Sequence, residues 1–219
     1  MIVPAAGTGD RFGGSRPKPF ADLGGKPVII RTLEVFGSCR SVDGIVLVGH
    51  RDWLKDYKGL VAAYGSKKVK AVVAGGDTRT QSVRSGLAAL GADADVVMVH
   101  DGVRPLVTQE IIASGIEAVK VTGAAIAAVP VKPTIKVIDP KAKMVMETLD
   151  RELLWEVQTP QVFERKILEK AYAEDRDGAS DDAALVERSG IKVHVFMGSY
   201  ANVKITTPED LVVARALLK

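Results

Sequence analysis

The chain of 219 residues is 47% apolar and 26% charged, which suffices for one substantial hydrophobic core and predicts a single domain over residues 1–219. Its 30 basic and 27 acidic residues give a formal net charge of +3, and because no long basic run concentrates that charge, we expect no nucleic-acid partner. No apolar run reaches the roughly 18 residues that cross a bilayer, and the N-terminus lacks the features of a signal peptide. A cytoplasmic protein without a membrane partner is therefore expected.

Short apolar runs rich in Val, Ile and Ala alternate with helix-like segments along the chain. The predicted strands are Ile2–Ala5, Gly44–Gly49, Val69–Ala74, Val96–His100, Ala124–Val129 and Val193–Met197. Helices are predicted to begin near Pro27, Trp53, Thr80, Gln109, Lys166 and Asp181, and a last one follows the N-cap Thr207 and ends near Leu218. This alternation is typical of an α/β fold, an open, mostly parallel Rossmann-like sheet with helices on both faces. Such sheets bind ligands at the carboxyl ends of their strands.

Residues of about 130–151 break this alternation. The segments Pro130–Ile138 and Met144–Thr148 have the character of two strands, and a turn at Asp139–Lys143 separates them. We therefore expect a projecting β-hairpin arm. Because an isolated two-stranded ribbon is barely stable in water, the arm should pack on something, and we favour a second subunit over the parent domain.

A loop rich in small residues follows the first predicted strand, and the cations Arg11, Arg16 and Lys18 follow within it or just beyond. Small residues let backbone N–H groups approach an anion closely, and a triphosphate needs such neutralisation. The dinucleotide fingerprint fails because Phe12 stands where its third glycine belongs, and the Gly-Lys-Ser/Thr of a P-loop is missing. The alternative is a glycine-rich surface turn with incidental basic residues.

Two further loops follow predicted strands at the same edge of the sheet. Gly75–Arg79 precedes the helix that contains Ser82, and His100–Pro105 places Asp101 at a strand end. We interpret His100 as a residue that supports Asp101. Together the three loops predict a pocket, and we expect Trp53 and Trp155, both in helix-like contexts, to pack rather than to stack on a base.

Six segments, which follow in order from Pro4 to about Leu211, carry a resemblance to a known family. They are Pro4-Ala5-Ala6-Gly7 with Gly9, Arg11 and Pro17-Lys18; Gly75-Gly76-Asp77 with Arg79 and Ser82-Val83; His100-Asp101 with Arg104-Pro105; Asp150-Arg151; Thr159-Pro160-Gln161; and Asn202-Val203-Lys204-Ile205-Thr206. In these segments the chain resembles the 2-C-methyl-D-erythritol 4-phosphate cytidylyltransferase family. The resemblance implies a nucleotidyltransferase that joins CTP to that acceptor and releases diphosphate in the non-mevalonate isoprenoid pathway.

The resemblance also implies roles for residues that match the family's pattern. The residues implied in catalysis are Arg11, Lys18, Lys204 and Arg151. Those implied in nucleotide binding are Pro4, Ala5, Ala6, Gly7, Thr8, Gly9, Gly76, Asp77, Ser82 and Asp101. Those implied in acceptor binding are Asp101, Arg104, Thr134, Arg151, Thr159, Ser180 and Lys204. The resemblance further implies a homodimer whose arm brings Thr134 and Arg151 to the partner's site. It also implies a Mg²⁺ ion, or another divalent cation, held mainly by the CTP phosphates, and no side-chain metal ligand is assigned.

The chain departs from the family pattern at Pro19, Gly102, Val103 and Pro133, which flank the expected acceptor site more than the CTP site. A cytidylyltransferase for another polyol phosphate, such as ribitol 5-phosphate, is therefore an alternative. A second alternative, of another class, is a nucleotide-binding regulator without turnover. A third, an NAD-binding oxidoreductase, is disfavoured by the missing third glycine.

Overall fold

The computed structural model describes residues 1–7, 12, 16–175 and 179–218. Thr8, Gly9 and Arg11, three of the predicted site residues, lie outside the described residues. None of the described helices combines the length and the apolar character that a membrane crossing requires.

A seven-stranded sheet forms the centre of the molecule, in the order β3-β2-β1-β4-β8-β5-β9. Its parallel strands are β1 (Ile2–Ala5), β2 (Ile45–Gly49), β3 (Val69–Ala74), β4 (Val96–Val99), β5 (Ala124–Pro130) and β9 (His194–Met197). One strand, β8 (Trp155–Glu164), runs antiparallel to its neighbours β4 and β5. The predicted open, mostly parallel sheet is confirmed.

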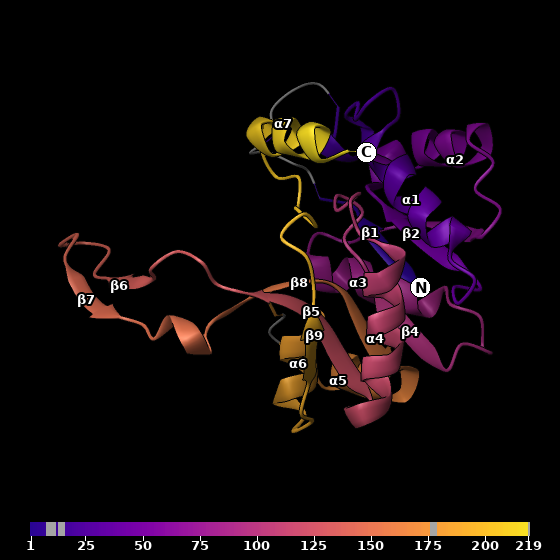
Figure 1. Cartoon of the computed structure of the whole chain (residues 1–219). Coiled ribbons are helices and arrows are strands. Elements are labelled where there is room, and N and C mark those ends of the chain that lie inside the picture. The colour runs from indigo at the N-terminus through magenta and orange to yellow at the C-terminus, as the bar shows by residue number, and fades with distance from the viewer. Residues whose placement is uncertain (8–11, 13–15, 176–178, 219) are drawn as a thin grey trace.

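Helices cover both faces of this sheet (Figure 1). One hydrophobic cluster joins the sheet to α1 (Val28–Ser38), α2 (Leu54–Ala63) and α4 (Gln109–Thr122). A second cluster joins it to α3 (Arg79–Ala88), α5 (Arg165–Glu174) and α6 (Asp182–Arg188). Alternate residues of a strand point to opposite faces, so Val3 belongs to the first cluster and Ile2 to the second.

The C-terminal helix, α7 (Pro208–Leu217), packs in a third, smaller cluster that includes Val103 and Ile205. Its predicted N-cap is confirmed, because the Thr207 hydroxyl accepts a hydrogen bond from the backbone N–H of Asp210. This cluster lies beside the loops that follow β1 and β4, so α7 helps to fix the ligand-binding edge of the sheet.

Strand β8 was not among the predicted strands, and the expectation of a helix-like context for Trp155 is wrong. Trp155 is the first residue of β8 and stays partly exposed. The pairing of β8 with β5 is irregular, since Gln161 pairs with Ile126 while Val157 pairs with Ala128, which leaves residues 158–160 in a bulge. Bulges often re-aim side chains next to a site, and the bulge here contains Thr159.

The predicted hairpin arm is confirmed as a structure. Strands β6 (Lys136–Ile138) and β7 (Val145–Thr148) form a separate antiparallel pair, and Figure 1 shows it extending to the left, away from the main sheet. Its large apolar side chains are exposed, among them Met144, Val145 and Met146. The described residues also form three short 3-10 turns, at Lys18–Phe20, Arg51–Trp53 and Arg151–Leu153.

Candidate active site

A pocket of about 470 Å³ opens at the carboxyl ends of β1, β2, β3 and β4. The predicted residues that line it are Pro4, Ala5, Ala6, Gly7, Lys18, Gly76, Asp77, Ser82, Asp101 and Lys204. Residues that line it without having been assigned a role are His50, Arg51, Gly75, Thr78, Arg79 and Val103. The structure therefore brings residues of the three predicted loops together with Lys204.

The loop after β3 requires glycine for steric reasons. A Cβ atom on Gly75 would stand 2.6 Å from the Ser82 Oγ, and one on Gly76 would stand 2.6 Å from the Gln81 Oε1. Thr78 and Gln81 form a capping box that starts α3 directly after this loop. The first turn of α3 therefore faces the pocket with its partial positive charge, which favours an anionic ligand.

Lys18 is held at the pocket by a small aromatic cluster. It begins the 3-10 turn Lys18–Phe20, in which Pro19 is buried and Phe20 packs on Tyr57 with ring centroids 4.6 Å apart. The Tyr57 hydroxyl donates to the backbone oxygen of Ala5 at 2.7 Å. Phe20 also packs on Trp53 at 5.6 Å, which agrees with the expected packing role of that tryptophan. The Pro19 departure thus lies in the scaffold under Lys18.

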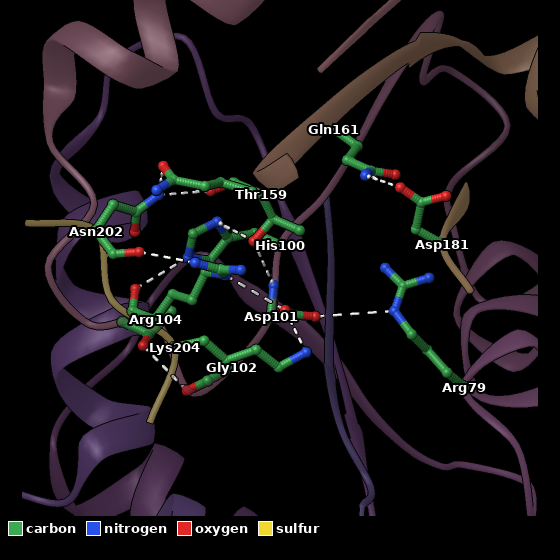
Figure 2. Close-up of polar contacts among 12 residues, drawn as sticks. Arg79, His100, Asp101, Gly102, Arg104, Thr159, Gln161, Asp181, Asn202 and Lys204 are labelled. Carbon is green, nitrogen blue, oxygen red and sulfur yellow. Dashed lines mark hydrogen bonds and ion pairs between the residues drawn. The ribbon is translucent and has the colours of Figure 1, made fainter. Parts of the chain in front are cut away.

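Asp101 contacts three cationic side chains (Figure 2). Its carboxylate oxygens lie 2.9 Å from the Lys204 Nζ, 3.5 Å from the Arg104 Nε and 3.8 Å from the Arg79 Nε. Burial would raise the pKa of Asp101, but Lys204, Arg79 and Arg104 together hold it far below its usual range. Asp101 is therefore ionised at neutral pH, and the surplus of cations around it favours a further anion in the pocket.

A buried relay behind Asp101 fixes its backbone. The Asp101 N–H donates to the Thr159 hydroxyl at 3.1 Å, and that hydroxyl lies 3.1 Å from the His100 Nδ1. Burial lowers the pKa of His100 to about 4, so its ring is neutral at pH 7. Because the Arg104 carbonyl, 3.0 Å from the His100 Nε2, can only accept, the Nε2 carries the proton and the Nδ1 accepts from Thr159. The interpretation of His100 as support for Asp101 is confirmed.

Lys204 is positioned between two backbone anchors. The Asn202 side chain donates to the Thr159 carbonyl at 2.8 Å, and the Ile205 N–H donates to the Val103 carbonyl at 2.9 Å. These bonds tie the segment that carries Lys204 to both β8 and the loop of Asp101. The loop between β9 and α7, which carries Lys204, is thereby fixed in the wall of the pocket.

Several residues predicted to bind the acceptor do not line this pocket. Arg104 is buried and donates to the Asn202 carbonyl at 2.8 Å, and Thr159 is buried in the relay. Ser180 is exposed and precedes Asp181, the N-cap of α6. Thr134 and Arg151 are exposed on the arm, where the Arg151 Nη1 donates to the Lys132 carbonyl at 2.9 Å. Their roles with the acceptor stay predictions, as does the role of Arg11.

The departures from the family pattern have different positions. Gly102 packs closely against the core, because a Cβ atom at this position would lie 2.8 Å from the Ile29 Cδ1 and 3.0 Å from the Ala5 Cβ. Gly102 is therefore explained by packing against α1. Val103 does line the pocket, and Pro133 is exposed on the arm beside Thr134.

No group of three or more His, Cys, Asp or Glu residues that could hold a metal ion occurs in the part of the chain that the structure describes. Asp101 is surrounded by cations, and Asp77 is paired with Arg51 at 2.6 Å at the pocket rim. This donor set fits a divalent ion that arrives with a phosphorylated ligand rather than one held in a cage of protein oxygens.

Comparison with known proteins agrees with this geometry. A family model described as 2-C-methyl-D-erythritol 4-phosphate cytidylyltransferase (IspD) matches residues 1–219. Proteins of that name from Dehalococcoides mccartyi and Alkaliphilus metalliredigens are 49% and 45% identical, over 100% of this chain and 95% and 92% of theirs. A 4-diphosphocytidyl-2C-methyl-D-erythritol synthase structure from Anaerococcus prevotii superposes with a TM-score of 0.84 at 33% identity, covering 98% of this chain and 95% of that one. The structure of 2-C-methyl-D-erythritol 4-phosphate cytidylyltransferase from Thermus thermophilus superposes with a TM-score of 0.81 at 31% identity, covering 99% of this chain and 97% of that one. The chain therefore belongs to the 2-C-methyl-D-erythritol 4-phosphate cytidylyltransferase family.

Proposed function

We propose that the chain transfers the cytidylyl group of CTP to 2-C-methyl-D-erythritol 4-phosphate, forming 4-diphosphocytidyl-2-C-methyl-D-erythritol and diphosphate in the non-mevalonate isoprenoid pathway. The observation that carries the proposal is the pocket in which Lys18, Lys204 and Asp101 converge on glycine-rich backbone, within a chain that matches its family over its whole length. The reaction takes place in the cytoplasm, where nucleoside triphosphates are available.

The cytosine and ribose of CTP occupy the side of the pocket formed by Ala5, Gly76, Asp77 and Ser82, in this proposal. Backbone groups can approach a base closely there because Gly76 carries no side chain. The triphosphate then extends toward Lys18 and the glycine-rich loop after β1, in which Arg11 supplies a further cation.

The acceptor phosphate is already a nucleophile at neutral pH, so the chemistry needs positioning and charge neutralisation more than a general base. An oxygen of that phosphate attacks the α-phosphorus of CTP in line. The new P–O bond forms as the bond from the α-phosphorus to the oxygen that bridges to the β-phosphorus breaks, and diphosphate leaves. Arg11, Lys18 and Lys204 stabilise the charge that spreads over the transferring group and the leaving diphosphate.

A Mg²⁺ ion bound through the CTP phosphates would neutralise part of the triphosphate charge and orient its oxygens. The chain's own contribution is the arrangement of cations around that charge. Asp101, held ionised beside Lys204 at 2.9 Å, keeps the lysine in the lining of the pocket.

The arm completes the site of a second subunit in this proposal. Two observations support a homodimer: the arm's apolar side chains Met144, Val145 and Met146 are more than half exposed in the described part of the chain, and Thr134 and Arg151 lie outside their own subunit's pocket lining. An arm exchanged between subunits would bury the first and bring the second to the acceptor phosphate.

The test is diphosphate release with CTP, Mg²⁺ and methylerythritol phosphate. We expect release only when the acceptor is present, and a loss of about 10²–10³ in turnover for Lys18→Ala, because removing one preorganised donor has that effect. Lys58→Ala, on the exposed surface of α2, is the matched control and should keep wild-type turnover. Tight CTP binding with no turnover on any polyol phosphate would instead favour a nucleotide-binding regulator.

A further inference from the structure

A buried chain of polar groups lies behind one wall of the pocket and is not explained by the mechanism above. Asp182, the first residue of α6, is fully buried. Its carboxylate accepts from the Tyr172 hydroxyl of α5 at 2.5 Å and from the Arg79 Nη2 of α3 at 2.6 Å. Burial and the neighbouring Asp182 raise the pKa of Tyr172 far above its usual range, so the phenol stays protonated and donates.

Asp182 is fixed to the sheet by the residues beside it. The Gln161 Nε2 of β8 donates to the Asp181 carboxylate at 2.8 Å, and the Ala183 N–H donates to the Gln161 Oε1 at 3.1 Å (Figure 2 shows the first pair). The start of α6 is therefore held on both sides of Asp182. Its carboxylate has a fixed place relative to the strand ends.

Stability is a weak reason to retain such an arrangement. Taking an arginine and a carboxylate out of water costs several kcal/mol per ion, and well-packed apolar residues often give equal or greater stability in place of a buried ion pair. A buried charge pair at the edge of a binding pocket therefore calls for a role in the pocket.

Arg79 connects the buried chain to the pocket. Its side chain is 25% exposed and lines the pocket, and its Nε lies 3.8 Å from Asp101, which also contacts Lys204. Asp182 engages the Nη2, while the Nη1 has no hydrogen-bond partner among the described residues. The guanidinium thus keeps donors available to a ligand while Asp182 holds its orientation.

We propose that Arg79 is a ligand-binding cation of this pocket, which donates to the phosphates of bound CTP, and that Asp182 and Tyr172 are positioning residues that aim it. The inference rests on the proposed function, which it deepens by adding a residue to the nucleotide site. Arginine suits this place better than lysine, because its planar fork can contact a buried carboxylate and a phosphate at once.

The test replaces the whole buried chain with apolar residues. The triple variant Arg79→Met, Asp182→Leu and Tyr172→Phe removes both charges and the hydroxyl together, and Asp101, which loses its contact with Arg79, keeps Lys204 and Arg104 as partners. We expect the melting temperature to stay near that of the wild type. We also expect kcat/KM for CTP to fall about tenfold to a hundredfold, the range for losing one charge-assisted hydrogen bond.

Arg84→Met is the matched control. Arg84 lies on the same helix and donates to the Tyr172 carbonyl at 2.9 Å, but it does not line the pocket. It should keep wild-type kinetics. A folded triple variant with wild-type kcat/KM would overturn the proposal, because the chain would then be structural.

A single variant and a binding measurement distinguish a positioning role from a purely structural one. Tyr172→Phe by itself leaves both charges in place and should raise KM for CTP several-fold at nearly unchanged melting temperature, and an unchanged KM would overturn the positioning role even if the triple variant does not fold. Calorimetric titration of each variant with CTP and Mg²⁺ separates this inference from the proposed function. If the wild type binds CTP but transfers to no tested acceptor, the proposed function fails, and CTP binding by the triple variant still decides the inference, because weaker binding supports it and wild-type binding overturns it.

Discussion

Asp101→Asn replaces one carboxylate oxygen with an amide nitrogen. It removes the only negative charge that Lys204 contacts among the described residues. Breaking a buried ion pair typically costs about 3–5 kcal/mol. Here each cation keeps an alternative, because Arg79 retains Asp182, Arg104 retains the Asn202 carbonyl, and Lys204 is 40% exposed to water. We therefore expect the free energy of unfolding to fall by about 2–3 kcal/mol, which leaves a typical domain folded.

Urea unfolding followed by circular dichroism measures this cost at pH 7, and diphosphate release measures activity on the same sample. Without Asp101, the Lys204 side chain is no longer held in place in the pocket, and kcat/KM should fall about 10²–10³-fold. The folded-state pKa of Asp101 lies below its unfolded value of 3.8, so its stabilising effect is present above about pH 4 and is lost as the pH falls through the folded-state pKa. The difference between wild type and variant should therefore shrink below pH 4. Wild-type stability together with wild-type activity would refute the role given to Asp101.

Three further predictions follow from other parts of the site. The pKa of His100 is lowered from 6.5 to about 4, so the folded state resists protonation and the free energy of unfolding falls as the pH drops below 6.5. Between pH 7.5 and pH 5.0 this residue should lower the free energy of unfolding by about 2 kcal/mol, and His100→Gln should remove that loss. Gly75→Ala should abolish CTP binding measured by calorimetry, because its Cβ would stand 2.6 Å from the Ser82 Oγ. A mixture of inactive Lys18→Ala and Arg151→Ala chains should recover part of the activity through hybrid sites if the arm is exchanged.

Each of these has a clear contrary result. A His100→Gln variant with the same loss of stability at pH 5.0 as the wild type would place the titrating group elsewhere. Normal CTP affinity in Gly75→Ala would mean that the base does not approach this loop. No recovery of activity, despite subunit exchange proven by mass spectrometry, would argue against a site shared between subunits.

Much of this site could be predicted from the sequence because its residues lie at strand ends. In a parallel sheet the carboxyl ends of neighbouring strands meet at one edge, so Gly76 and Asp101 were expected near the loop after β1. The departure at Gly102 could not be interpreted in that way. Its cause is the approach of Ile29 from α1, and contact between helix and loop leaves no periodic signal in the sequence.

Strand β8 was missed because its sequence conflicts with its position. Gln158, Thr159 and Gln161 are buried, and Pro160 cannot donate to a sheet ladder, so the segment lacks the apolar run of a central strand. Its polar groups are satisfied by partners far away in the sequence, such as Asn202 for Gln158 and Asp181 for Gln161. Such pairings depend on the fold and cannot be recognised from local pattern.

Arg79 belongs to the motif that begins at Gly75, but nothing in the local pattern indicated a role for it. Its contacts, like those of β8, depend on the fold. Its partner Asp182 lies 103 residues further along the chain, within an acidic segment whose ordinary interpretation is a solvated cap. Only the packing of α3, α5 and α6 on one face of the sheet brings them together.

The proposed acceptor is tested by comparing kcat/KM for methylerythritol 4-phosphate and for ribitol 5-phosphate, with CTP and Mg²⁺ held constant and diphosphate release as the readout. We expect a strong preference for methylerythritol phosphate, and a loss of activity on that acceptor in Lys204→Ala. A preference for ribitol 5-phosphate would contradict the proposed acceptor while leaving the nucleotide site intact. Absence of diphosphate release with both acceptors would contradict the proposed transfer itself.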